Sequence, residues 1–372
     1  MLRKNRKKLI SLLMLVLFTV LVVRVNRVTK TELVSRNGQT FEKAVVEEIL
    51  TDNLQADGSR VGQQTVTVKM LTGVRKGETL EVTSSSGYLF GAGCIPGMHV
   101  IVMQSVAGET TIASVYTQDR EWVIYIFAAL YLLLLCVIGG KQGVRGSLGL
   151  VFTFISVIFL YIPLIYQGYS PFWTAVFVCF VTTLVTMYLI GGTAGKTICA
   201  IGGTIAGILC AGVTALIFSK ASGISGYNVS DIETLLTLWN TDGIQVGGLL
   251  FSGLLISALG ATMDVAMSVS SAMEEIAKQN PNLSMRELWL SGMRVGRDMM
   301  GTDSNTLILA FAGTSTSTLL LDYAYDLPYQ QIINSNNIGI AIMQGLSGSF
   351  GIVLSVPLTV TLCAFVMKRG IA

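Results

Sequence analysis

The chain has 372 residues, of which 52% are hydrophobic and only 13% are charged, and its mean hydropathy is +0.65. Soluble domains carry about 25% charged residues, so this composition suits a protein whose surroundings are mostly lipid. The formal net charge of +3 is too small, and the basic residues are too widely spread, to indicate nucleic-acid binding. We therefore expect a protein whose main partner is a lipid bilayer.

The six cysteines are scattered singly along the chain and form no CxxC pair, so neither a zinc site nor a disulfide framework is predicted. We interpret them as packing residues and expect no metal and no cofactor. They are Cys94, Cys136, Cys179, Cys199, Cys210 and Cys363.

The N-terminal residues 1–25 have the pattern of a signal-anchor helix. Five basic residues within positions 3–8 precede an apolar run over residues 9–23. Arg24 and Arg27 follow, without the small residues of a cleavage site, so we expect the segment to be uncleaved.

Residues 26–121 are polar, rich in Val and Thr, and punctuated by glycine, which predicts a small all-β domain. The expected strands cover residues 42–49, 65–71, 79–83, 99–106 and 110–116. Five short strands with tight turns indicate a small barrel, OB-like or SH3-like. The domain lacks the aromatic and basic ladder of an oligonucleotide binder, so we expect a structural or partner-binding role.

Residues 122–372 form the predicted membrane domain. Seven apolar runs approach the roughly 20 residues needed to span a bilayer. They cover residues 122–138, 148–166, 172–190, 198–218, 246–268, 306–321 and 338–367. With the signal-anchor, this predicts an α-helical polytopic protein with about eight transmembrane helices, and Pro357 favours a tilt, kink or break in the last one.

The distribution of basic residues predicts the orientation, because loops rich in Lys and Arg stay in the cytoplasm. If the N-terminus is cytoplasmic, the later inner loops contain nine basic residues and the short outer loops contain only Lys220. We therefore expect both termini in the cytoplasm and the barrel, residues 26–121, on the extracytoplasmic side.

Catalytic motifs are weak. Residues 345–348 match the short GxSG string of intramembrane serine proteases, but the only histidine, His99, lies in the predicted barrel. A GxGD string of aspartyl intramembrane proteases is missing, although Asp264 and Asp303 supply two carboxylates. We therefore do not expect an enzyme.

Small and polar residues recur every three or four positions in three of the runs, so each set lies along one helical stripe. The stripes are Gly253, Ser257, Gly260, Asp264, Ser268 and Ser271; then Asp303, Thr306, Ala310, Gly313 and Ser317; then Asn337, Ala341, Gln344, Gly348, Gly351 and Ser355.

Two interpretations of these stripes stay open. Small residues let helices approach closely in any membrane bundle. Alternatively, ionisable and amide side chains inside spans face a hydrated pathway. The candidate solute or ion path comprises Asp264, Ser268, Asp303, Asn305, Thr306, Asn337 and Gln344.

Counting 1.5 Å per residue from Val246 places Asp264 near the inner membrane edge, level with Asp303. The two carboxylates either share an inner vestibule or are separately solvated. Between them, Ser284 and Glu287 form a capping box that starts an amphipathic helix. We expect that helix to lie on the inner membrane surface, where it either gates the vestibule or connects two spans.

Several long strings resemble the YibE/F-like membrane proteins. They are residues 260–268, Asn280-Pro281, residues 291–302 and residues 305–308, together with the turn at residues 139–143. The resemblance covers most of residues 122–367, and the outer barrel looks like that of a YibE-type member. It implies a multipass protein of the bacterial plasma membrane and a shorter YibF-like paralogue as partner.

Two functional hypotheses follow from these patterns. The first is permease-like transport of a small solute or ion through a polar path lined by Asp264. The alternative is a non-transporting membrane scaffold that binds an envelope or membrane partner through its β domain.

Overall fold

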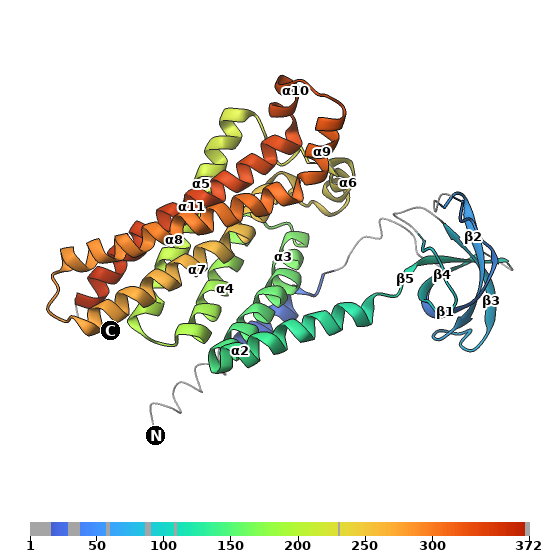
Figure 1. The fold of residues 1–372 in the computed structure, drawn as a ribbon, viewed down its shortest axis with the longest axis horizontal. Coiled ribbons are helices and arrows are strands. Elements are labelled where there is room, and N and C mark those ends of the chain that lie inside the picture. The colour runs from blue at the N-terminus through green and yellow to red at the C-terminus, as the bar shows by residue number, and fades with distance from the viewer. Residues whose placement is uncertain are drawn as a thin grey trace. The chain divides into compact units, whose positions relative to one another are not determined.

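The computed structural model describes residues 16–28, 38–56, 60–85, 91–107, 110–229 and 231–368, drawn in Figure 1. It divides into two compact units. One is Glu32–Leu134, and the other combines Met1–Thr31 with Leu135–Ala372. Residues 1–15 of the expected signal-anchor lie outside the described residues, and the described part of that segment contains a short apolar helix, Val16–Val25.

The first unit contains a closed five-stranded barrel. Its strands are β1 (Gln39–Thr51), β2 (Gln63–Met70), β3 (Thr79–Ser85), β4 (His99–Ala107) and β5 (Thr110–Gln118). Their order around the barrel is β1-β2-β3-β5-β4, with β3 and β5 parallel and the other neighbours antiparallel. All five expected strands are confirmed, and a five-stranded barrel with this crossover favours the OB-like alternative.

Alternating valines build the barrel interior. On β2, Val66 and Val68 are buried, whereas Thr65 and Thr67, which alternate with them, face outward and are more exposed, as the period of two predicts. Cys94, the one cysteine outside the apolar runs, is also fully buried here. Burial raises the pKa of its thiol, so Cys94 behaves as a packing residue.

The second unit begins its main helical part with a reversal of the chain at Gly140. Helix α2 (Glu121–Ser156) continues through a π-helical turn (Val157–Tyr161) into α3 (Ile162–Tyr166). Within α2, Gly140 adopts φ 53° and ψ −131°, which is not a helical conformation. The Cys136 and Ser147 side chains lie 3.5 Å apart, whereas eleven residues of uninterrupted helix would separate them by about 17 Å. The chain therefore folds back on itself at Gly140.

The remaining helices follow the expected apolar runs and add three short ones. They are α4 (Pro171–Gly191), α5 (Gly195–Ser222), α6 (Ile232–Asp242), α7 (Leu249–Gln279), α8 (Met285–Thr314), α9 (Thr316–Ala324), α10 (Tyr329–Ile333) and α11 (Asn336–Lys368). The sequence patterns did not predict α6, α9 or α10. Helix α11 continues past Pro357, so of the tilt, kink or break expected there the break does not occur, and the tilt and the kink stay predictions.

The number of membrane spans is lower than expected when counted by length and composition. Five of the described helices qualify, or six if α8 and α9 form one bent span. The expected count of about eight is not confirmed. This count treats the run Glu121–Tyr166 as a single candidate span of 46 residues, because it does not divide the run at the reversal at Gly140.

Helix α8 corrects two expectations. The capping box is present, since the Glu287 N–H donates to Ser284 Oγ and the Ser284 N–H donates to Glu287 Oε2. However, the amphipathic segment that follows is not a separate surface helix, because it continues without interruption to Thr314. The expected span over residues 306–321 is instead interrupted at Ser315, where α8 and α9 meet at a bend of 55°.

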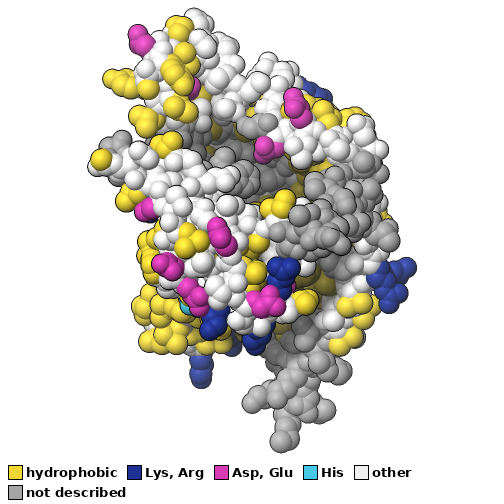
Figure 2. All heavy atoms as spheres, turned by 90° about the vertical axis from the view of Figure 1, so that its right-hand side faces the viewer, with side chains coloured by type: hydrophobic (Ala, Val, Ile, Leu, Met, Phe, Trp, Pro, Cys, Tyr) yellow, Lys and Arg dark blue, Asp and Glu magenta, His cyan; other side chains and the backbone are white. Residues whose placement is uncertain are grey.

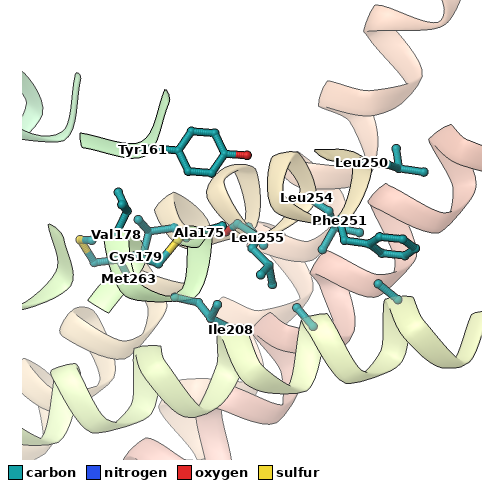
Figure 3. Packing of buried hydrophobic residues seen from close by; sticks show 14 of the residues in the cluster. Tyr161, Ala175, Val178, Cys179, Ile208, Leu250, Phe251, Leu254, Leu255 and Met263 are labelled. Carbon is teal, nitrogen blue, oxygen red and sulfur yellow. Dashed lines mark hydrogen bonds between the residues drawn. The ribbon is translucent and has the colours of Figure 1, made fainter. Parts of the chain in front are cut away.

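Two apolar clusters hold the helical unit together. The larger one joins α4, α5 and α7, with Tyr161 packing from the π-helical turn (Figure 3). The Tyr161 and Ser252 hydroxyls form a hydrogen bond, which satisfies the polar end of this buried ring. The second cluster joins α7, α8 and α11, and Figure 1 shows α8 and α11 side by side.

Small residues bring α5 and α11 together. A Cβ added at Gly203 would stand 1.8 Å from Thr359 Oγ1, so Thr359 would have to move to make room for it. The closest approaches along the contact pair Gly203 with Thr359, Gly207 with Ser355 and Gly351 with Ala211. Each step of four residues along one helix matches four residues back along the other, so the two helices are antiparallel and in register.

In Figure 2 acidic side chains are spread over the face, and most of the basic ones are in its lower half, several of them next to acidic ones. This matches the composition, in which acidic and basic residues nearly balance. The expected absence of a nucleic-acid partner stays a prediction.

Candidate functional site

The depth of Asp264 can be measured against α4, which has the length of one bilayer crossing. Its 21 residues span about 31 Å, close to the thickness of a hydrocarbon core. Helix α7 is parallel to α4 and stays in step with it. The contacts along this pair are Pro171 with Gly248, Cys179 with the Leu255 carbonyl, and Gly191 with Met267.

Asp264 precedes Met267 by three residues, so it lies about 5 Å inside the level at which α4 ends. We call this end of the bundle the Gly191 end. Helix α7 continues beyond it for twelve residues to Gln279, or about 18 Å. The carboxylate is therefore near one membrane boundary and not at the costly centre.

Asp303 on α8 lies beside Asp264. The two carboxyl groups are close enough to repel each other, and α7 and α8 also touch further along, where Gly292 packs against Met273. The structure thus places the two carboxylates, which the sequence predicted to lie at one depth, within electrostatic range of each other. None of the described side chains forms a hydrogen bond or an ion pair with either carboxylate. Two such groups can share one proton or jointly bind a cation.

The surface around the carboxylates is open and lined by small residues. Asp264 is exposed, and so are Gly253, Ser257 and Gly260 on the same stripe of α7. A Cβ at Gly253 or Gly260 would meet no atom within 4 Å. The part of the first stripe from Gly253 to Asp264 therefore packs against none of the described helices, although such packing is the role that small residues usually have.

The other candidate residues are distributed over the depth of the bundle. Asn305 and Thr306 are exposed on α8, next to Asp303, and the Thr306 hydroxyl donates to the Thr302 carbonyl. Ser268 follows Asp264 by one turn of α7 and is half-buried.

Asn337 and Gln344 do not join this group. Asn337 starts α11 near the opposite end of the bundle, where Gly339 packs against Ile224 just after α5. Gln344 lies two turns further in and is half-buried. The third stripe then continues into the buried α5 contact at Gly351 and Ser355, so its lower half packs helices.

An ion-pair cluster at the Gly191 end was not predicted from the sequence. Glu274 on α7 accepts from Lys196 on α5 at 2.9 Å and from Lys278 at 3.2 Å. The pair Glu274 and Lys278 could have been found from its spacing of four residues, but Lys196 is distant in sequence. Among the described residues no group of three or more potential metal ligands is present.

Comparison with known proteins gives one match. The model of the YibE/F-like protein family matches residues 127–369. Neither the curated proteins nor the solved structures contain a significant match. The matched segment includes α4 to α11 and both carboxylates of the candidate site. Because it covers well over half of the 372 residues, the chain belongs to the YibE/F-like family.

Proposed function

We propose that the chain is a permease-like membrane protein that moves a small solute or ion past Asp264 and Asp303. The observation that carries this proposal is the pairing of two carboxylates on adjacent helices, about one helical turn inside a membrane boundary. Ionisable groups at such depth are expensive in lipid, and those that persist face water, protein or a transported species.

A cation is the species best matched to the site. Two neighbouring carboxylates repel each other, and a bound cation or a shared proton relieves that repulsion. The small side chains around them leave room for hydration, since additional atoms at Gly260 would meet nothing. We infer that the open face of α7 and α8 forms one wall of the path.

The proposed topology has eight crossings. Counting the reversal at Gly140 as a break divides the run Glu121–Tyr166 into two segments, and the helix Val16–Val25 belongs to the described part of the signal-anchor. The positive-inside pattern then places both termini and the Gly191 end in the cytoplasm, in a bacterial plasma membrane. Carboxylates at this end would form an inner vestibule.

Flux measurements test the proposal. Purified full-length protein is reconstituted in proteoliposomes, and Na⁺, K⁺ and H⁺ movements are followed with fluorescent indicators. Asp264→Asn and Asp303→Asn should each lower flux of the transported cation about tenfold or more, because the amide removes the charge that attracts it. Asp298→Asn is the matched control, since this exposed carboxylate on the same helix is in no described ion pair, and it should leave flux unchanged.

If Asp264→Asn, Asp303→Asn and the control Asp298→Asn all transport the cation as fast as the native protein does, the assignment of the site is wrong. Absence of flux for every cation would instead favour the scaffold alternative. That function would use the outer face of the barrel, where exposed Phe41 on β1 and Tyr116 on β5 pack edge to face beside exposed Ile112.

A further inference from the structure

The register between α5 and α11 has a consequence for two of the cysteines. Gly203 lies against Thr359, and the contacts repeat every four residues along both helices. One turn further toward the Gly191 end, the same register places Cys199 opposite Cys363. Both belong to the same buried cluster, with 1% and 0% of their surface exposed.

The two thiols lie close enough to interact with each other. The Cys363 sulfur also lies beside the Ser270 hydroxyl of α7, which donates to the Ala266 carbonyl at 2.6 Å. A polar group beside a sulfur favours its thiolate form, which is the nucleophile in thiol chemistry. Of the two cysteines, Cys363 is therefore the one prepared to react first.

The thiol pair lies near the partly exposed end of the bundle. Lys196 precedes Cys199 by one turn of α5, and its ion pair with Glu274 leaves 27% and 19% of the two side chains exposed. The negative charge of Glu274 opposes ionisation of the Cys363 thiol. Because both thiols are buried, only a small uncharged oxidant could reach them, and the partly exposed ion pair marks this end of the bundle as the nearest described surface.

We propose that Cys199 and Cys363 are a redox-active dithiol that a peroxide oxidises to a disulfide linking α5 to α11. The Cys363 thiolate attacks one oxygen of hydrogen peroxide, which breaks the O–O bond, forms a sulfenic acid and, after protonation, releases water. The Cys199 sulfur then attacks the sulfenic sulfur and a second water leaves. Two thiols lose two electrons and two protons, and the peroxide is reduced to two water molecules.

The disulfide would fix the closest helix pair of the bundle at its Gly191 end. It would close a loop from α5 to the last helix and so oppose any separation of these two helices. This proposal concerns a covalent modification and does not depend on what the protein transports.

Thiol counting tests the proposal on the full-length protein in detergent. After treatment with hydrogen peroxide, the protein is denatured in SDS and its free thiols are labelled with a polymer-linked maleimide, so that each label shifts the gel band. The count should fall from the six cysteines of the sequence to four, and dithiothreitol should restore six. Mass spectrometry of the unreduced digest should show a peptide pair joined through Cys199 and Cys363.

Variants separate this pair from the other cysteines. Cys363→Ser should keep five free thiols after peroxide. Cys199→Ser should fall from five to four, because Cys363 stops at the sulfenic acid, and should show no link between two cysteines. Cys210→Ser, the control on α5, should fall from five to three. A count that stays at six after peroxide, and also after molecular iodine, an apolar oxidant that enters lipid and forms the same disulfide, would overturn the proposal. So would a link that joins either residue to a different cysteine.

Discussion

At the scale of single residues, the barrel depends on an ionic cluster beside its last strand. Asp119 accepts from the Glu121 N–H at 3.0 Å and pairs with Lys43 of β1 at 3.3 Å, and only 8% of its side chain is exposed. Lys43 also pairs with Glu121. The Glu121 N–H, followed by the Lys43 ammonium, holds the pKa of Asp119 below its usual value, although burial opposes this effect.

This lowered pKa predicts how barrel stability depends on pH. A carboxyl group with a lower pKa in the folded than in the unfolded state stabilises the fold above its unfolded pKa, about 3.9 for Asp. That contribution is lost as the pH falls through the folded pKa. We expect hydrogen-exchange protection of β1 and β4, corrected for intrinsic rates, to decrease below about pH 4 in the native protein.

Asp119→Asn should abolish the decrease in hydrogen-exchange protection at acidic pH. It should also lower the protection of β1 and β4 at neutral pH. Glu48→Gln is the control, because Glu48 is an exposed carboxylate on β1, the strand of Lys43, and enters no described ion pair. An identical pH profile in Asp119→Asn and the native protein would contradict the assigned role.

At the scale of elements, the first and last residues of a helix could be predicted from the sequence where the apolar run alone sets its length. The apolar run at residues 172–190 became α4 with one added residue at each end, because spanning length is fixed by the bilayer. Helix α8 was not predictable in this way. Its polar first half extends into the span because Gly292 and Gly296 let Val360 and Val356 of α11 approach closely, and that contact is not visible in a local pattern.

The reversal at Gly140 gives a prediction about stability. Its positive φ is unfavourable for a residue with a Cβ, so Gly140→Ala should cost about 1–3 kcal/mol of unfolding free energy. Gly139→Ala is a matched control, because neither glycine has an atom within 4 Å of an added Cβ and only Gly140 has positive φ. The control should be neutral or stabilising by up to about 1 kcal/mol. Reversible SDS titration of both variants measures the difference, and equal stability would exclude a strained break.

At the scale of the whole molecule, the sequence predicted the division into a barrel and a helical unit, which the structure shows, and a common depth of Asp264 and Asp303, which stays a prediction. Both follow from composition and from counting residues along helices. Which face of α7 carries Asp264 was not predictable. Neighbours such as α5 at Thr262 and α11 at Ala258 decide which stripe is buried, and their positions require the assembled bundle.

The proposed orientation predicts which segments reagents reach from outside. We expect an impermeant maleimide to label Glu233→Cys, exposed on α6, in intact cells and to leave Gln279→Cys, exposed at the end of α7, unlabelled until the membrane is opened. The native protein measures the background from its own cysteines. Labelling of Gln279→Cys alone in intact cells would mean that the orientation is reversed. Labelling of both variants would contradict the proposed topology.

The reversal at Gly140 also decides whether the number of membrane crossings is odd or even. The compartment in which a membrane protein ends depends only on whether its crossings are odd or even in number. With a straight helix at this position the count would change by one, and every segment from α4 to the C-terminus would be on the opposite side. In the proposed topology of eight crossings, the one residue Gly140, with its positive φ, thus decides which compartment meets the carboxylate pair.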